Sequence, residues 1–254
     1  MLRKRVIPTL LLMNDSLVKT TKFNKNKFIY VGDPCNTIRI FNELEVDELI
    51  FLDISATIKN KKPNFELLKR ISGECFMPLC YGGGIKSIED VKLIFSIGFE
   101  KIILNSLLFS NQQLVSEIIN AYGSQAVVAS IDVKKNLFGK EYVYSNCGTV
   151  NTFITPEVWS KKVEGMGVGE IFLTSVEREG TWKGMDFNLI KKISNMVKIP
   201  LIAHGGCKEK NELKEIFSKT EVSAVGLGNL VIFQKKNMGV LINFPEKEFL
   251  DEIC

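Results

Sequence analysis

Short apolar runs and amphipathic stretches alternate along this chain, and no other feature restricts the fold as strongly. The apolar runs predict buried strands at 5–12, 48–54, 78–82, 101–106, 126–133, 170–176, 200–205 and 224–229. Helical spacing of apolar residues predicts helices at 34–44, 64–75, 87–97, 111–121, 156–166, 186–196 and 209–218. The strands are almost continuously apolar, which is typical of parallel strands buried on both faces. Eight such strands in 254 residues predict an α/β fold, the (β/α)8 TIM barrel.

The two halves of the chain resemble each other. Residues 77–84 (Met-Pro-Leu-Cys-Tyr-Gly-Gly-Gly) correspond to 199–206 (Ile-Pro-Leu-Ile-Ala-His-Gly-Gly), an offset of 122 residues, and Glu48 corresponds to Glu170 at the same offset. We therefore expect one domain over residues 1–254, built from half-barrels at about 1–123 and 124–254. The segment 134–151, rich in Gly, Asn and Tyr, predicts a short hairpin over the barrel mouth.

Charge and hydropathy exclude several classes of protein. Lys and Arg number 33 and Asp and Glu number 29, and the net charge of +4 is spread along the chain, so we expect no nucleic-acid partner. The apolar run 6–13 contains Pro8 and lacks a small-residue cleavage site, so we interpret it as a strand and not as a signal peptide. No other run approaches the roughly 18 apolar residues of a membrane span, so no membrane association is expected.

The cysteines point to a reducing compartment. Six are scattered without a C-x-x-C pair, and the chain has one histidine. This pattern does not favour a disulfide framework or a zinc site. We expect reduced thiols, a cytoplasmic location, no metal and no cofactor.

Paired glycines follow the third and seventh predicted strands at equivalent places in the repeat. They are Gly83-Gly84 and Gly205-Gly206, and Gly180 and Gly228 follow neighbouring strands. Glycine lets the backbone approach a phosphate closely, and N–H groups at the next helix start can then bind it. Tight turns alone would explain one such pair. Two pairs at equivalent positions favour a ligand with a phosphate at each end.

Two further residues at the carboxyl ends of strands could carry chemistry. Asp132 follows a long apolar run and is a candidate general acid or base, with a capping or salt-bridge role as the alternative. His204 also ends a strand, and a lone histidine there is more often an orienting or packing group than a ligand contact. Active sites of (β/α)8 barrels lie at this end of the strands.

Charged residues precede four of the strands at the opposite end. They are Arg5, Glu48, Lys101 and Glu170. Counting in steps of two places Asn105 on the same face as Lys101, and Thr174 on the same face as Glu170. If that face is the lumen, two positive and two negative side chains can form a ring at the barrel floor, since buried charges need partners. A structural floor and a gated opening are the two interpretations.

Four segments together resemble HisF, the cyclase subunit of imidazole glycerol phosphate synthase, over essentially the whole chain. They are Asp-Glu-Leu-Ile-Phe-Leu-Asp-Ile at 47–54, Tyr-Gly-Gly-Gly-Ile at 81–85, Gly-Ser-Gln-Ala-Val-Val at 123–128 and Gly-Glu-Ile-Phe-Leu-Thr-Ser at 169–175. The resemblance implies a HisH-like glutaminase on the N-terminal barrel face and ammonia passing through a charged gate to a substrate with two phosphates. Arg5, Glu48, Lys101 and Glu170 match the gate, and Asp132 matches one of two catalytic aspartates. The expected phosphate- and substrate-binding residues are Lys19, Gly83, Gly84, Asn105, Ser106, Thr174, Gly180, Gly205, Gly206, Gly228 and Asn229.

The second catalytic aspartate of that family is missing. Leu11 occupies its position, and leucine cannot transfer a proton; loss of a positioned acid or base costs about 10²–10⁴ in rate. Glu179 replaces an aspartate, and His204 and Asn229 each replace a serine. The gate pattern is therefore intact while the mouth is altered.

With an intact gate and an altered mouth, the chain resembles a HisF-like branch that is associated with a sugar amidotransferase in surface-polysaccharide synthesis. The long first loop ending at Asp33-Pro34 and the tail 240–245 also resemble that branch. The resemblance implies a lyase-type synthase subunit that delivers ammonia for amidation of a sugar. The alternatives are an authentic cyclase that makes imidazole glycerol phosphate and AICAR from the histidine-pathway ribulosyl bisphosphate (PRFAR), and a non-catalytic scaffold that only conducts ammonia.

Overall fold

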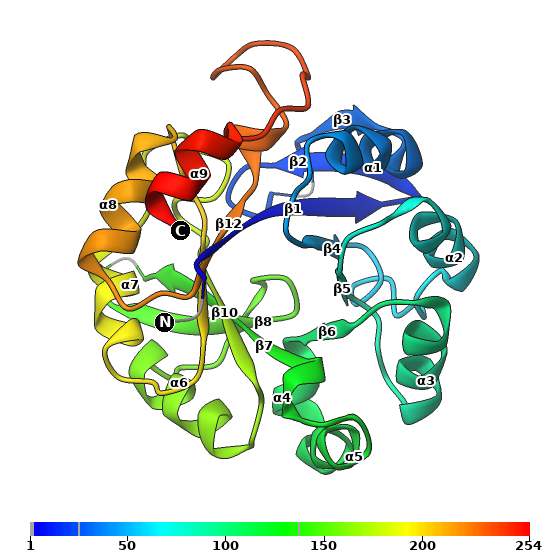
Figure 1. Ribbon diagram of the computed structural model, residues 1–254. Coiled ribbons are helices and arrows are strands. Elements are labelled where there is room, and N and C mark those ends of the chain that lie inside the picture. Colours follow the sequence, from blue (N-terminus) through cyan, green and yellow to red (C-terminus); the bar gives the residue numbers. More distant parts are fainter. Residues whose placement is uncertain (1–2, 25, 137) are drawn as a thin grey trace.

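Eight parallel strands close into a barrel in the computed structural model, which describes residues 3–24, 26–136 and 138–254 (Figure 1). Within these residues the barrel strands are β1 (Arg5–Met13), β4 (Leu49–Asp53), β5 (Leu79–Gly82), β6 (Lys101–Leu104), β7 (Val127–Lys135), β10 (Glu170–Ser175), β11 (Leu201–His204) and β12 (Ala224–Leu227). Each pairs with the next, and pairing of β12 with β1 closes the barrel. The (β/α)8 fold predicted from the sequence is confirmed.

Helices surround the barrel as an outer ring (Figure 1). They are α1 (Pro34–Glu43), α2 (Phe65–Glu74), α3 (Ile88–Ile97), α4 (Ser106–Ser110), α5 (Gln112–Tyr122), α6 (Pro156–Gly165), α7 (Phe187–Ser194), α8 (Asn211–Lys219) and α9 (Lys247–Ile253). Local signals fix their starts: the Asp33 side chain caps α1 with Pro34 at its first position, and Ser87 and Asp90 form a capping box at α3. The short α4 and the final α9 lie outside the predicted helices.

Apolar side chains fill the lumen between its two ends. The central layer contains Ile7, Ile50, Cys80, Ile103, Val128, Phe172, Ile202 and Ala224. A separate and larger cluster lies between the sheet and the helices. Because side chains alternate along a strand, residues two positions below this layer point to the barrel floor and those two positions above point to the mouth. The polar ends of the lumen are thus separated by an apolar segment.

Two antiparallel hairpins extend the sheet at the mouth. β2 (Ser16–Thr20) pairs with the end of β1 and with β3 (Phe28–Gly32), a hairpin that the sequence analysis did not predict. β8 (Glu141–Ser145) pairs with the extended end of β7 and with β9 (Val150–Asn151), as expected for segment 134–151.

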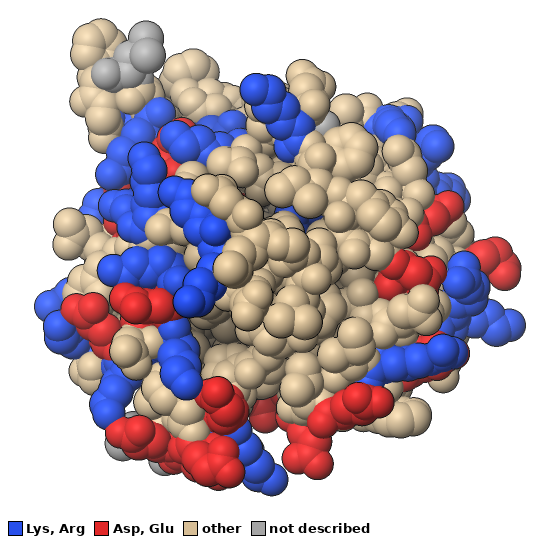
Figure 2. Space-filling model, turned by 90° about the horizontal axis from the view of Figure 1, so that it is seen from above, with Lys and Arg blue, Asp and Glu red and all other residues tan. Residues whose placement is uncertain are grey.

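β3 carries three consecutive exposed apolar or aromatic residues, which lie on both faces of the strand because side chains alternate: Phe28, Ile29 and Tyr30 are 50%, 57% and 61% exposed. The flank at the top of Figure 1, which includes β3 and the projecting segment 234–246, faces the viewer in Figure 2 and has few charges at its centre. In the described part of the chain, no helix is long and apolar enough to cross a membrane.

Candidate functional site

Four charged side chains form a closed ring at the floor of the barrel. Arg5 Nη1 lies 2.5 Å from Glu48 Oε2, and its other terminal nitrogen donates to Glu170. Lys101 Nζ lies 3.0 Å from Glu48 Oε1 and 3.3 Å from Glu170 Oε2. Each carboxylate oxygen therefore has its own cationic partner. Burial opposes the charge on Arg5 and Lys101, but the two glutamates outweigh it and raise both pKa values.

The ring lies at the N-terminal ends of the barrel strands, where the sequence predicted it. Arg5, Lys101 and Glu170 are the first residues of β1, β6 and β10, and Glu48 directly precedes β4. Arg5 is paired in register with Ala224, and Glu170 with Val128, at the N-terminal ends of the strands. Ile103 and Phe172, two residues after Lys101 and Glu170, belong to the apolar layer of the lumen. The step-of-two prediction thus agrees with the structure, and the four residues face the lumen.

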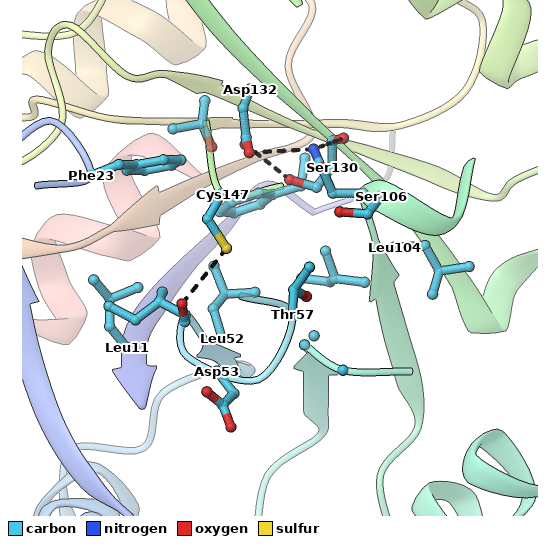
Figure 3. A pocket seen from close by; sticks show the side chains of 18 of the residues that line it. Leu11, Phe23, Leu52, Asp53, Thr57, Leu104, Ser106, Ser130, Asp132 and Cys147 are labelled. Carbon is cyan, nitrogen blue, oxygen red and sulfur yellow. Dashed lines mark hydrogen bonds between the residues drawn. The ribbon is translucent and has the colours of Figure 1, made fainter. Parts of the chain in front are cut away.

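A cavity of about 120 Å³ lies at the opposite end, where the strands end (Figure 3). Its wall includes the predicted residues Gly83, Gly84, Asn105, Ser106, Asp132 and Thr174, together with Leu11, Ser130, Cys147, Glu179 and His204. The loop after β8 closes one side through Cys147. The structure thus brings together residues from widely separated parts of the chain, as the position of active sites in this fold requires.

Asp132 is the buried carboxyl of this cavity. Ser130 Oγ donates to Asp132 Oδ1 at 3.2 Å, and Asn105 Nδ2 donates to Asp132 Oδ2 at 3.3 Å. Burial is the largest influence and raises the pKa of Asp132 to about 7, while the hydrogen bond from Ser130 and the charge of Lys134 oppose it. A carboxyl with such a pKa can both take and give a proton near neutral pH.

Leu11 brings an apolar side chain to the same cavity. It lies on β1 opposite Leu52 of β4 and is 5% exposed (Figure 3). No atom of leucine can exchange a proton, so this wall of the cavity contributes only packing. Of the two aspartate positions implied by the family resemblance, one retains a carboxyl and one does not.

The predicted glycines divide into two groups on different sides of the mouth. Gly83 and Gly84 lie on the wall of the main cavity, whereas Gly180, Gly205, Gly206, Gly228 and Asn229 surround a small cavity of about 10 Å³. Positive φ angles and close backbone approach make glycine necessary at several of these turns: a Cβ on Gly84 would lie 2.7 Å from the Lys61 carbonyl oxygen. Turn geometry alone therefore explains much of the glycine pattern.

Lys19 and Glu179 are buried beside the second glycine group. Lys19 Nζ donates to the Thr9 carbonyl oxygen at 3.0 Å, and a Cβ on Gly228 would lie 2.9 Å from both Lys19 Nζ and Glu179 Oε1. Burial lowers the pKa of Lys19, and the nearby Glu179 partly opposes this shift. Asn229 Nδ2 donates to the Gly180 carbonyl oxygen at 3.1 Å and so links two of the loops.

His204 and Glu179 were not among the expected site residues, yet both lie on the cavity wall. His204 Nδ1 is 3.2 Å from Thr174 Oγ1, and His204 Nε2 is 3.6 Å from Glu179 Oε2. The sequence signal for them was their departure from the family pattern at adjacent strand ends. That signal did not reveal that the two side chains meet.

The fold and site define a (β/α)8 barrel with a buried acid at its mouth and a closed ring of charges at its floor. Residues 5–237 match the family described as histidine biosynthesis protein, and the chain belongs to this family. Its relatives include "Putative imidazole glycerol phosphate synthase subunit hisF2" of Pseudomonas aeruginosa, which is 48% identical over 251 residues, 99% of each chain. A protein of Leptospira borgpetersenii, "Putative imidazole glycerol phosphate synthase subunit HisF", is 44% identical over 246 residues, 96% of each chain. "Imidazole glycerol phosphate synthase subunit HisF" of Hydrogenobaculum sp. is 36% identical over 241 residues, 95% of each chain.

Proposed function

We propose that this chain is the barrel subunit of a cytoplasmic glutamine-dependent amidotransferase complex. A HisH-like glutaminase on the N-terminal face supplies ammonia, which passes the ring and the lumen to a phosphorylated ligand at the mouth. One observation carries this proposal: a ring of paired charges lies directly below an apolar lumen that leads to a polar cavity. Ammonia is neutral and crosses apolar surroundings far more cheaply than ammonium does.

The ring is suited to a transient opening. Lys101 contacts both glutamates and its side chain is 22% exposed, so it can move toward a bound partner while Arg5 keeps a contact with each glutamate. Opening in this way breaks two contacts and leaves no carboxylate without a cation. The proposed role of Arg5, Glu48, Lys101 and Glu170 is therefore an ammonia gate.

The altered mouth favours amidation of a surface-polysaccharide sugar as the use of this ammonia. Leu11 removes one proton-transfer group, and His204 lies on the cavity wall at a position where the family resemblance implies a serine. These departures, beside an intact ring of charges, favour an ammonia acceptor other than the histidine-pathway bisphosphate.

A sugar amidotransferase is the proposed third component. Ammonia that leaves the mouth into water becomes protonated, so the enzyme that uses it must dock close by. The β2–β3 hairpin is a suitable surface, because β2 pairs with the end of β1 beside the mouth and β3 exposes the uncharged side chains of Phe28, Ile29 and Tyr30.

The alternative function is the cyclase–lyase reaction that converts PRFAR to imidazole glycerol phosphate and AICAR. The retained Asp132, with its pKa of about 7, favours this reading, because it alone could serve as the acid–base group. Both functions share the gate, the lumen and the phosphorylated ligand, and they differ in the acceptor of ammonia.

Turnover of PRFAR by the purified chain with ammonium salts distinguishes the two. We expect no turnover by the wild type, because the proton-transfer group at position 11 is absent, and Leu11→Asp serves as the matched variant. Normal wild-type turnover would establish the cyclase and refute sugar amidation. The complex reconstituted with its glutaminase and with candidate acetylated sugars, followed by mass spectrometry for exchange of oxygen for nitrogen, then tests the proposed acceptor.

A further inference from the structure

Three side chains at the exit of the lumen form a series of polar contacts. Thr174 and His204 are register partners on neighbouring strands β10 and β11, and Glu179 lies in the loop after β10. The hydroxyl of Thr174 is 3.2 Å from His204 Nδ1, and the carboxylate of Glu179 is 3.6 Å from His204 Nε2. The order hydroxyl–imidazole–carboxylate is the arrangement that activates a hydroxyl for proton transfer.

The position of this series connects it to the lumen. The His204 ring stacks on Phe172 of the apolar layer, with ring centroids 4.8 Å apart and planes at 29°. A Cβ on Gly226 would lie 3.2 Å from His204 Cδ2, so the absence of a side chain at Gly226 makes room for the ring. Thr174, Glu179 and His204 all lie on the wall of the mouth cavity. A molecule that leaves the lumen therefore passes these three residues.

The groups on either side of the ring indicate the direction of the series. A carboxylate faces His204 Nε2 at 3.6 Å, longer than a hydrogen bond, and we place the imidazole hydrogen on this nitrogen because a carboxylate oxygen accepts. His204 Nδ1 then has a lone pair and can accept from the Thr174 hydroxyl. Burial lowers the pKa of His204, Glu179 opposes this effect and Lys19 adds to it; these two are the charged groups that face the ring. The imidazole is therefore neutral near pH 7 and can take up a proton.

Two atoms of the series lack a protein partner among the described residues. Glu179 Oε1 and His204 Nε2 are buried and make no hydrogen bond. Glu179 and His204 are 2% and 3% exposed. A buried polar atom without a partner costs about 1–3 kcal/mol, so such atoms beside a cavity mark a place for a small polar ligand. Glu179 Oε1 calls for a ligand with N–H or O–H groups, and ammonia has three N–H groups.

We propose that Thr174, His204 and Glu179 form a proton relay that accepts the proton ammonia loses when it adds to a carbonyl carbon held at the mouth. The inference rests on the function proposed above. The nitrogen lone pair forms the C–N bond, and the π electrons of the carbonyl move to its oxygen. One proton leaves the nitrogen for Thr174 Oγ, whose own proton passes to His204 Nδ1, and Glu179 stabilises the imidazolium. The new alkoxide takes the proton of Asp132, which gives a neutral carbinolamine, and His204 returns its proton to Asp132 through solvent.

The relay supplies the proton acceptor that Leu11 cannot. Leu11 lies on β1, whereas Thr174 and His204 lie on β10 and β11, so the relay approaches the mouth from a different wall. Asp132 lies on β7 beside β10, with Thr174 and Asp132 paired in register. The two halves of the proton transfer therefore lie on adjacent strands.

The chain offers a direct measurement, because His204 is its only histidine. Protein labelled with ¹⁵N-histidine gives the NMR signals of one imidazole, which report its tautomer and protonation. At pH 7.5 we expect a neutral ring with the hydrogen on Nε2. Thr174→Val should shift the Nδ1 resonance, Thr174→Ser should restore it, and Glu179→Gln should lower the pKa of His204 further by removing the charge that raises it.

A ligand titration separates a relay from a packing histidine. Ammonium chloride, added near the pKa of ammonium so that free ammonia is present, should shift the imidazole resonances, and sodium chloride at the same concentration should not. A hydrogen on Nδ1, or resonances that do not respond to ammonia, would overturn the relay. Glutamine hydrolysis that stays coupled to product in Lys101→Ala would instead count against ammonia conduction, so the two ideas fail in different experiments.

Discussion

Buried polar groups have partners at one end of the barrel lumen and lack them at the other. At the floor, four charged side chains satisfy one another completely, with every carboxylate oxygen of Glu48 and Glu170 paired to a cation. At the mouth, buried oxygen and nitrogen atoms of Thr9, Asn105, Glu179 and His204 have no partner within the described residues. A satisfied ring is stable in the isolated chain, whereas the polar atoms of an unsatisfied cavity wall gain their partners from water or a ligand. The comparison indicates a closure at one end and a binding surface at the other.

Replacing the buried acid of the mouth should produce the largest effect, and it should increase stability. The pKa of Asp132 is about 7, above its ordinary value of 3.8, so the folded protein keeps this proton over a pH range in which the unfolded chain has lost it. Wild-type stability therefore falls as the pH rises from about 4 to about 7. Asp132→Asn avoids this loss, and we expect it to be more stable than the wild type by about 4 kcal/mol at pH 8.

Urea denaturation at several pH values measures this difference. The advantage of Asp132→Asn should disappear near pH 4, where both states of the wild type are protonated, and the exposed Asp251→Asn should show no such trend. A constant difference between variant and wild type across this range would mean that Asp132 titrates normally. It would also remove the case for Asp132 as an acid near neutral pH.

Replacing a residue of the gate should lower the stability, in contrast to Asp132→Asn. Lys101→Ala leaves Glu48 and Glu170 buried with Arg5 as their shared cation, so we expect a loss of about 3 kcal/mol in the free energy of unfolding. In the complex, glutamine hydrolysis should continue while ammonia transfer falls, because the opening is no longer controlled. The matched control is Lys161→Ala on α6, which loses only an exposed ion pair with Glu164. Product formation that remains proportional to hydrolysis would show that the ring is a structural floor.

The sequence alone predicted which residues face the lumen at the floor and at the mouth, because this depends on local periodicity. Counting in twos from Lys101 and Glu170 led through Ile103 and Phe172 to Asn105 and Thr174, and strand geometry guarantees that such residues share a face. The β2–β3 hairpin was missed because its pattern is inverted: Lys19 is buried whereas Phe28, Ile29 and Tyr30 are exposed.

The proton relay was missed for a different reason. Thr174 and His204 are 30 residues apart in the chain, and their contact depends on the register of β10 with β11. Glu179 reaches the ring from a loop whose path no periodicity describes. Sequence patterns thus locate residues at an end of the barrel, and only the tertiary structure shows which of them touch.

The smallest expected effect concerns the glycine turns of the mouth. There, a role in phosphate binding and a role in turn formation alone lead to different expected affinities. Gly84→Ala places a Cβ 2.7 Å from the Lys61 carbonyl oxygen at a φ of +70°, whereas Gly139→Ala meets nothing within 4 Å at a φ of +77°. The left-handed backbone costs alanine about 1 kcal/mol at both sites, and crowding at Gly84 should bring its loss to about 2 kcal/mol. Calorimetry with inorganic phosphate and with a sugar phosphate then examines binding. A turn that holds phosphate should lose at least tenfold in affinity in Gly84→Ala and nothing in Gly139→Ala, and equal affinities in all three proteins would leave Gly84 with a purely conformational role.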